Sequence, residues 1–263
     1  MTVTGTLTQT RAENRAALVG YLPAGFPSVE GSIAAMNTAI DAGCDIIEVG
    51  FPYSDPVMDG AAIQRAGSIA LAGGIRTRDV FHVVESVAGR GVPILVMTYW
   101  NPVERYGVDA FARDLAAAGG AGLITPDLIP EEAGDWIAAS DAHDLDRVFL
   151  VAPSSTDERI ARTVSVTRGF VYAQSIMGTT GVRATTSSAA PGLVERTRGV
   201  TDLPIGVGLG VRNGEQAAEV ASYADAVIVG SALVSRLLEQ TDDAAGLRAL
   251  HDLTAELAAG AGR

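Results

Sequence analysis

The chain has 263 residues and a formal net charge of −12, and its 19 basic residues are all arginine. The absence of lysine excludes a Schiff-base nucleophile, a covalent pyridoxal phosphate anchor and a Walker-type phosphate lysine. The acidic balance argues against nucleic acid and anionic membrane surfaces as partners, because both favour a basic surface. Since the N-terminus has no signal-like apolar stretch and no segment approaches about 18 apolar residues, we expect a soluble, cytoplasmic protein.

Short β-rich segments alternate with longer amphipathic segments along the whole chain. The predicted strands are Ala17–Leu22, Asp45–Gly50, Pro93–Thr98, Gly122–Thr125, Arg147–Val151, Phe170–Gln174, Pro204–Val207 and Ala226–Val229. The predicted helices between them include Val29–Ala42, Arg78–Gly89, Val108–Ala118, Pro130–Ala142, Thr156–Val166 and Gly214–Ser222. This alternation is typical of repeated βα units that build a parallel sheet.

Eight βα units in one chain of this length favour a single domain over residues 1–263. We predict an α/β fold, a (β/α)8 TIM barrel with a parallel eight-stranded core and extra N-terminal and loop helices. The alternative is an open doubly wound sheet. Its usual G-x-G-x-x-G fingerprint is absent after the first strand, which leads into the segment Pro23–Pro27 instead.

A carboxylate stands inside the second predicted strand. Alternation of side chains places Ile46 and Glu48 on one face of this strand and Ile47 and Val49 on the other. Glu48 would then point into the barrel, near the rim where catalytic groups of this fold gather. Because an unpaired buried carboxylate is costly, Glu48 is either a catalytic group or one half of a salt bridge with an arginine.

The loop that follows, Phe51–Gly60, is rich in acidic residues and proline. Asp59 is a second candidate carboxylate, whereas Asp55 in Ser-Asp-Pro is also typical of an ordinary turn. Apolar and aromatic residues near the same rim would suit a flat hydrophobic substrate pocket. These residues are Tyr21, Phe51, Tyr53, Met97, Tyr99 and Tyr172.

Glycine gathers at the ends of the sixth, seventh and eighth predicted strands, in Gly178–Gly181, Gly206–Gly210 and Val229–Ser231. Exposed backbone N–H groups and a helix N-terminus can bind phosphate without lysine. The following segment Ala232–Gln240 would be the short extra helix that caps a barrel phosphate site. Packing or turn geometry is the alternative explanation for each glycine. The pattern predicts a phosphate ester as the ligand.

The remaining chemistry-bearing residues are predicted to be structural. His82, His143 and His251 lie in predicted helices, away from the strand ends, and none has the histidine partner at i+4 that paired zinc motifs require. Cys44 precedes the second strand and is expected to be a small buried apolar residue. We therefore predict no metal site.

The segment Ile47–Gly60 closely resembles the signature of the tryptophan synthase alpha chain family, and the resemblance covers nearly the whole chain. Further matching segments are Tyr21–Pro27, Tyr99–Pro102, Pro126–Leu128, Met177–Gly181, Gly208–Val211 and Val229–Ser231. The resemblance implies retro-aldol cleavage of indole-3-glycerol phosphate to indole and glyceraldehyde 3-phosphate. It also implies a beta-chain partner, in an alpha2beta2 heterotetramer, that receives indole for L-tryptophan synthesis. Pyridoxal phosphate would belong to that partner, with no cofactor in this chain.

The resemblance also assigns roles to single residues. Glu48 matches the principal acid–base catalyst, and Asp59 matches the carboxylate that accepts the indole N–H bond. Thr180 matches a mobile-loop threonine that positions the aspartate, while the roles of Thr179 and Arg183 stay open. The other substrate-binding candidates are Tyr21, Met97 and Tyr172. The phosphate cradle would be Gly181, Gly210, Gly230 and Ser231, and the segments facing the beta chain contain Asp55, Pro56 and Asn101.

Two other phosphate-binding barrels of aromatic amino acid synthesis are disfavoured by the residue inventory. Indole-glycerol-phosphate synthase uses lysine, which this chain lacks. Phosphoribosylanthranilate isomerase would need a cysteine at a strand end, as part of a cysteine–aspartate pair. A catalytically silent barrel that binds a phosphate ligand and regulates a partner enzyme remains as the alternative from a different functional class.

Overall fold

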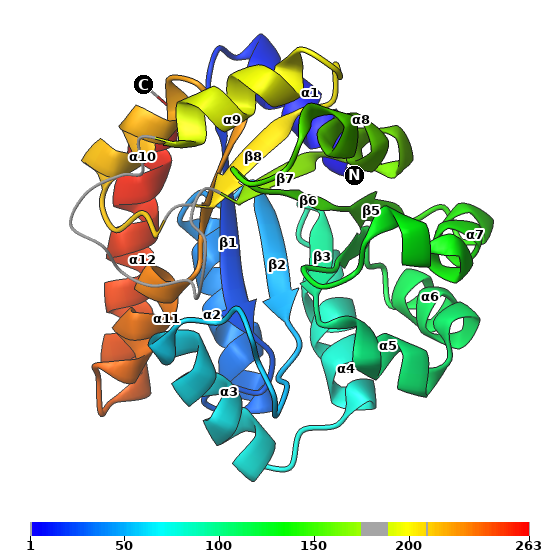
Figure 1. Cartoon of the computed structure of the whole chain (residues 1–263). Coiled ribbons are helices and arrows are strands. Elements are labelled where there is room, and N and C mark those ends of the chain that lie inside the picture. Colours follow the sequence, from blue (N-terminus) through cyan, green and yellow to red (C-terminus); the bar gives the residue numbers. More distant parts are fainter. Residues whose placement is uncertain (1, 175–188, 209, 263) are drawn as a thin grey trace.

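The computed structural model describes residues 2–174, 189–208 and 210–262. Its strands form one parallel sheet that curls into a barrel, and helices cover the outside of the barrel (Figure 1). The strand order in this part of the chain is β5-β4-β3-β2-β1-β9-β8-β7-β6. The predicted barrel architecture is therefore confirmed, and the open doubly wound sheet is not found.

The strands agree closely with the predicted segments. They are β1 Ala17–Pro23, β2 Ile46–Gly50, β3 Ile94–Met97, β4 Gly122–Ile124, β5 Asp146–Val148, β6 Leu150–Val151, β7 Val171–Gln174, β8 Ile205–Gly208 and β9 Ala226–Val229. β1 is buried along its whole length, as is β2, because the inner face packs in the barrel and the outer face packs under helices.

One difference concerns the fifth predicted strand, Arg147–Val151, which is divided at Phe149. β5 pairs with β4, whereas β6 pairs with β7, so the segment changes neighbour between the two pieces. The N–H group of Tyr172 donates to the carbonyl of Phe149 at 3.1 Å. In the part of the chain that the structure describes, nine strands thus replace the eight predicted, because one stretch of chain supplies both ends of the sheet and closes the barrel.

The helices account for the long segments between strands. They are α1 Val3–Ala12, α2 Val29–Asp41, α3 Ala61–Ala72, α4 Thr77–Ala88, α5 Trp100–Tyr106, α6 Val108–Ala117, α7 Gly134–Ala142, α8 Asp157–Val166, α9 Ala189–Arg198, α10 Gly214–Ala221, α11 Ser231–Leu238 and α12 Asp243–Ala261. The predicted helix Pro130–Ala142 consists of a short 3-10 turn, η1 Pro130–Glu132, followed by α7. Within the described residues, no helix combines the length and the apolar character needed to cross a bilayer.

The helix α1 closes one end of the barrel. Its side chains Val3 and Leu7 pack in the same buried cluster as inward-facing strand residues such as Val19 and Ile46. Thr2 caps the helix by accepting a hydrogen bond from the N–H of Gly5 at 3.1 Å. In Figure 1, α1 lies at the end of the barrel from which β1 and β2 start. The opposite end, where these strands finish, is the end that carries the site residues.

Candidate active site

Glu48 lies inside the barrel, in register with Tyr21 of β1 and Leu95 of β3. The predicted alternation is confirmed, because Ile46 belongs to the interior cluster while Ile47 and Val49 pack in the other cluster. Glu48 is fully buried, and neither carboxylate oxygen has a hydrogen-bond partner among the described residues. No arginine of the described chain pairs with it, so the salt-bridge interpretation is not supported.

Burial raises the pKa of Glu48 to about 8. The cause is loss of solvation, which penalises the charged form of a carboxyl group that has no compensating donor. A carboxyl with such a pKa keeps its proton at neutral pH and can give it to a bound molecule. Perturbed acids of this kind gather at functional sites, where their cost is offset by chemistry.

Two tyrosines border Glu48, and two glycines make room for them. A Cβ atom added at Gly50 would overlap the Tyr21 hydroxyl, and one added at Gly208 would overlap the Tyr172 hydroxyl. Burial, and to a lesser extent the Glu48 carboxylate, raises the pKa of both phenols well above the usual value. Both hydroxyls therefore remain protonated near Glu48. The sequence pattern predicts both tyrosines near the rim and places Gly208 in a glycine-rich strand end, but it does not indicate that Gly50 and Gly208 make room for the phenol rings.

Asp59 lies in the loop between β2 and α3, and its carboxylate is hydrogen-bonded to Tyr99. The Tyr99 hydroxyl donates to Asp59 Oδ1 at 3.1 Å and accepts from the N–H of Met58 at 2.9 Å. Burial raises the pKa of Asp59, and the hydrogen bond from Tyr99 opposes that rise. Burial also raises the pKa of Tyr99 to about 12, which keeps its hydroxyl available as a donor. The charge of Asp59 also contributes to the raised pKa of Tyr21, as does that of Glu48, so both candidate carboxyl groups lie near Tyr21.

The other rim residues take different places. Met97 is half-buried at the end of β3 and packs against the interior cluster. Tyr53 packs against Tyr99 with ring centroids 5.3 Å apart, and its hydroxyl accepts from Asn101 Nδ2 at 3.0 Å. Phe51 packs against the larger hydrophobic cluster, which also contains Val49. These contacts tie the loop after β2 to the start of α5.

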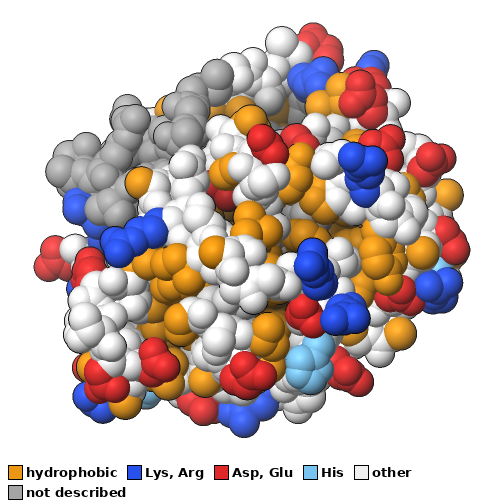
Figure 2. All heavy atoms as spheres, turned by 90° about the horizontal axis from the view of Figure 1, so that it is seen from below, with side chains coloured by type: hydrophobic (Ala, Val, Ile, Leu, Met, Phe, Trp, Pro, Cys, Tyr) orange, Lys and Arg blue, Asp and Glu red, His pale blue; other side chains and the backbone are white. Residues whose placement is uncertain are grey.

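The face at which the strands finish carries exposed hydrophobic side chains. Figure 2 views the molecule from the side toward which β1 and β2 run, and hydrophobic atoms gather across this face. Val57, in the loop after β2, is 68% exposed, and Ile129, after β4, is 36% exposed. Asp55 is also exposed in the same loop as Val57, and its carboxylate accepts from the Ser54 hydroxyl at 2.6 Å. Large exposed apolar surfaces of this kind typically mark protein contacts.

The glycine-rich strand ends meet at one side of the barrel mouth, because β7, β8 and β9 are neighbours. Gly230 and Ser231 stand at the N-terminus of α11, where no side chain of the described residues caps the helix. Gly210 has a φ of 70°, a left-handed conformation that favours glycine, in the loop after β8. The predicted extra helix is confirmed as α11. The predictions for Thr179, Thr180, Gly181 and Arg183 lie outside the described residues.

His82 and His251 lie in helices as predicted, whereas His143 follows the last residue of α7 and is not in the helix. His82 and His251 are exposed, and His143 Nε2 lies 3.4 Å from Asp109 at the surface. Cys44 is buried, and burial raises the pKa of its thiol. In the part of the chain that the structure describes, no group of three or more potential metal ligands comes together.

Comparison with known proteins agrees with this geometry. The family model "Tryptophan synthase alpha chain" matches residues 7–261. The alpha chain of Salinispora tropica is 67% identical over 252 residues, covering 96% of this chain and 94% of the relative. That of Mycobacterium marinum is 65% identical over 250 residues, covering 95% and 91%.

Solved structures match over the same length. A structure of Mycobacterium tuberculosis tryptophan synthase superimposes with a TM-score of 0.94 at 61% identity, covering 99% of this chain and 98% of the other. The alpha subunit from Legionella pneumophila gives a TM-score of 0.89 at 32% identity, covering 98% and 97%. On these matches of sequence and fold, the chain belongs to the tryptophan synthase alpha chain family.

Proposed function

We propose that the chain is the catalytic alpha subunit of a tryptophan synthase and that it cleaves indole-3-glycerol phosphate to indole and glyceraldehyde 3-phosphate. The observation that carries this proposal is the fully buried Glu48, whose carboxylate oxygens have no partner among the described residues and whose pKa is raised to about 8. A silent regulatory barrel has no need of such a group, and keeping it unpaired costs stability. The proposed activity gives the group a task.

The proposed chemistry is a retro-aldol cleavage that needs proton transfer and charge stabilisation. Protonated Glu48 gives its proton to C3 of the indole ring, and the ring nitrogen takes up the positive charge. Asp59, as a carboxylate, accepts the ring N–H bond and stabilises that charge. Glu48, now ionised, removes the proton from the hydroxyl on the carbon attached to C3. The bond between C3 and that carbon then breaks, its electrons neutralise the ring, and indole and an aldehyde result.

The remaining assignments concern binding. We propose that Tyr21, Met97 and Tyr172 line the pocket for the indole ring, since both tyrosines border Glu48 and Met97 ends the neighbouring strand β3. The phosphate group would be held by backbone N–H groups of Gly210, Gly230 and Ser231 and by the N-terminus of α11. We also propose that Thr180 positions Asp59 and that Gly181 contributes to the phosphate site. An arginine is not required for this phosphate site, and lysine is absent from the chain.

The chain is further proposed to work with a beta chain, in a cytoplasmic alpha2beta2 heterotetramer. The exposed apolar residues after β2 and β4, together with Asp55, Pro56 and Asn101, are the proposed contact surface for that partner. Pyridoxal phosphate would reside on the beta chain, since this chain has no lysine to anchor it. Residues 1–263 are proposed to form a single barrel domain.

The decisive experiment is an indole-release assay on the purified chain with indole-3-glycerol phosphate, with and without a cognate beta chain. We expect release in both conditions and faster release with the beta chain. Glu48→Gln should abolish release while leaving binding of glyceraldehyde 3-phosphate intact, and Asp59→Asn should lose roughly 10²–10⁴-fold in rate. Absence of release from the unaltered chain in both conditions would favour the silent barrel. Appreciable turnover by Glu48→Gln would refute its assigned role.

A further inference from the structure

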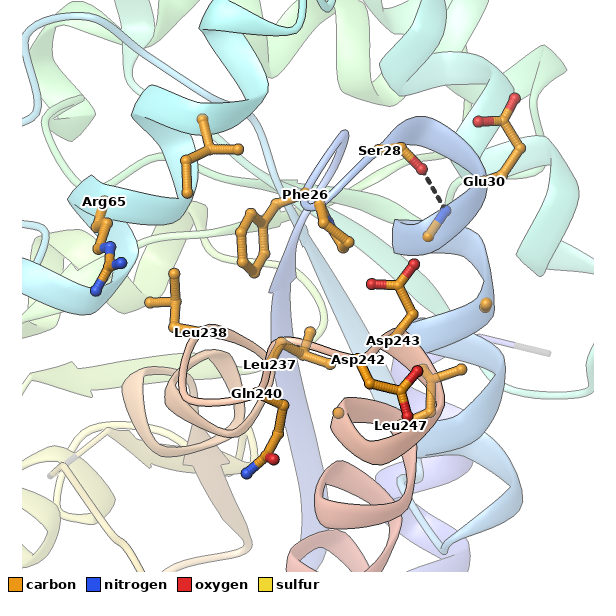
Figure 3. Close-up of a pocket in the computed structure, with 15 residues that line it drawn as sticks. Phe26, Ser28, Glu30, Arg65, Leu237, Leu238, Gln240, Asp242, Asp243 and Leu247 are labelled. Carbon is orange, nitrogen blue, oxygen red and sulfur yellow. Dashed lines mark hydrogen bonds between the residues drawn. The ribbon is translucent and has the colours of Figure 1, made fainter.

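An apolar groove lies on the outside of the barrel, lined by the first turn of α2, one side of α3, the end of α11 and the start of α12 (Figure 3). Its polar side chains are all exposed, and the hydroxyl of Ser28 already accepts from the N–H group of Gly31 at 2.9 Å. None of the buried side chains that lack a hydrogen-bond partner in the described chain lines this groove. Unmet hydrogen-bonding capacity is found instead inside the barrel, at Glu48.

Tyr21 brings a second polar group without a partner to the side of Glu48. Its side chain is 8% exposed, and its hydroxyl forms no hydrogen bond with any described residue. The hydroxyl of Tyr99, in contrast, is bonded to both Asp59 and Met58. A buried polar group without a partner costs free energy, and a ligand that supplies the partner removes that cost. Glu48 and Tyr21 thus stand side by side, and each lacks a hydrogen bond that a ligand can provide.

The Tyr21 hydroxyl lies on the side of Glu48 that faces the barrel mouth. Tyr21 of β1 and Glu48 of β2 are register partners, so their side chains leave the sheet on the same inner face. Gly50 follows Glu48 by two residues toward the mouth, on the same face of β2. Because a Cβ atom added at Gly50 would overlap the Tyr21 hydroxyl, the hydroxyl reaches that position. A molecule that enters from the mouth therefore contacts Tyr21 as it reaches Glu48.

The side chain of Tyr21 also lies along the path that the glycerol chain of the proposed substrate has to take. A Cβ atom added at Gly230 would stand 3.3 Å from the Tyr21 ring, so this side chain extends from the proposed phosphate site to the end of β2. The glycerol chain joins the phosphate to the indole ring, and it therefore runs beside Tyr21. Burial raises the pKa of Tyr21, and the charges of Asp59 and Glu48 raise it further, whereas for Tyr172 the charge that adds to burial is that of Glu48. Of these two phenols, Tyr21 is the one placed near both carboxyl groups.

We propose that Tyr21 is a further catalytic residue, whose hydroxyl donates a hydrogen bond to the substrate oxygen from which Glu48 removes the proton. This inference rests on the proposed cleavage reaction. A hydroxyl group both donates and accepts, so the substrate hydroxyl beside C3 of the indole ring can donate to the Glu48 carboxylate and accept from Tyr21. As its proton passes to Glu48, negative charge grows on this oxygen, and the hydrogen bond from Tyr21 becomes stronger. Tyr21 keeps its own proton while the bond to C3 breaks and the oxygen becomes that of the aldehyde.

The test is the variant Tyr21→Phe, which removes the hydroxyl and keeps the ring. Indole release from indole-3-glycerol phosphate is measured with the full chain and a cognate beta chain. We expect kcat to fall about 10- to 100-fold, the scale of one hydrogen bond to a group that carries charge. KM should change less than about threefold, because the hydrogen bond gains most of its strength as charge develops. The matched ligand is indole-3-propanol phosphate, which lacks both side-chain hydroxyls of the substrate. Its Kd should be the same for Tyr21→Phe and the unaltered chain.

Tyr223→Phe is the matched control, because it removes a half-buried hydroxyl just before β9, at the end of the barrel where the strands start. It should keep the kcat of the unaltered chain. An unchanged kcat in Tyr21→Phe, beside normal release by the unaltered chain, would overturn the role of Tyr21 and leave the proposed function standing. Weaker binding of indole-3-propanol phosphate by Tyr21→Phe, in step with the loss of kcat, would also overturn it, since the hydroxyl would then shape the pocket. No release by the unaltered chain would refute the proposed function and this inference with it.

Discussion

Glu48 carries a carboxyl group whose ionisation costs more in the folded chain than in the unfolded chain. Its place could be predicted from the sequence, because strand alternation and an otherwise apolar run are local patterns. The absence of a pairing arginine could not be predicted. That depends on which side chains from distant segments reach the same point in the barrel. The raised pKa of Glu48 therefore follows from tertiary structure and not from its neighbours in sequence.

This raised pKa predicts a pH-dependent stability effect of Glu48→Gln. Between the unfolded value of 4.5 and the folded value of about 8, the folded chain holds a proton that the unfolded chain has released. Stability from this group is complete below that window and is lost as pH rises through it, by up to about 1.4 kcal/mol per pH unit. Glutamine has no such loss. The gain in Tm of Glu48→Gln over the unaltered chain should thus grow from near zero at about pH 4 to a maximum above about pH 8.

Calorimetric Tm values across this pH range provide the measurement. Glu85→Gln, at an exposed position on α4, is the control and should show no comparable trend. A stabilisation by Glu48→Gln that is constant with pH would contradict the assignment, because it would reflect packing and not ionisation.

The sequence pattern predicts Tyr99 near the rim but not its hydrogen bond with Asp59, which lies 40 positions away. Tyr99→Phe removes the donor to Asp59 and the acceptor for the Met58 N–H group. Because the hydrogen bond lowers the pKa of Asp59, its loss raises that pKa further. We expect the rate of indole release at neutral pH to fall about tenfold, the scale of one hydrogen bond to a charged group. The acid limb of the pH–rate profile should move to higher pH.

The control for this variant is Tyr106→Phe, which removes a hydroxyl that donates to Asp114 at 2.6 Å on the outside of the barrel. It should keep both the rate and the pH profile of the unaltered chain. If Tyr99→Phe lowered the rate without moving the acid limb, the hydroxyl would act through general loop stability and not through Asp59.

At the scale of elements, the agreement between sequence and structure depends on how local each signal is. The helices α2, α4 and α10 begin within one residue of the predicted positions, because capping residues and amphipathic periodicity lie within the segments themselves. The division of the fifth strand at Phe149 had no local signal. It arises because this segment must pair with β4 on one side and β7 on the other. Closure of a sheet is a property of all its strands together.

The helix α1 offers a test at the element scale, because it separates stability from catalysis. Leu7 is almost fully buried in the interior cluster, at the end of the barrel opposite the catalytic pair. Leu7→Ala should lower the free energy of unfolding by about 2–5 kcal/mol. The rate of indole release below the melting temperature should stay unchanged. Thr4→Ala, at an exposed position of the same helix, is the control. A loss of rate in Leu7→Ala at constant folded fraction would contradict this separation.

At the scale of the whole molecule, the composition of the chain, which has no lysine, excludes catalysis through a lysine Schiff base. A chain without lysine can bind phosphate through backbone N–H groups, and the glycine-rich ends of β7, β8 and β9 lie side by side, as that proposal requires. The loop after β7 falls outside the described residues, so Thr180 and Gly181 rest on sequence resemblance alone. The apolar groove beside α3 and α12 was not predicted, because its walls come from four separate helices.

Because α1 closes one end of the barrel, the two ends of the interior differ. Val3 and Leu7 fill the end at which the strands start, and packed side chains occupy the space between them and Glu48. Within the described residues, the side of Glu48 that faces α1 is therefore filled with packed side chains, and the other side faces the loops that follow the strands. The loops at the other end of the barrel carry the exposed side chains Val57 and Ile129. The surface proposed for the beta chain thus lies at the end of the barrel that α1 leaves open, and packing by α1 and entry of the product into a partner would be served by opposite ends of one fold.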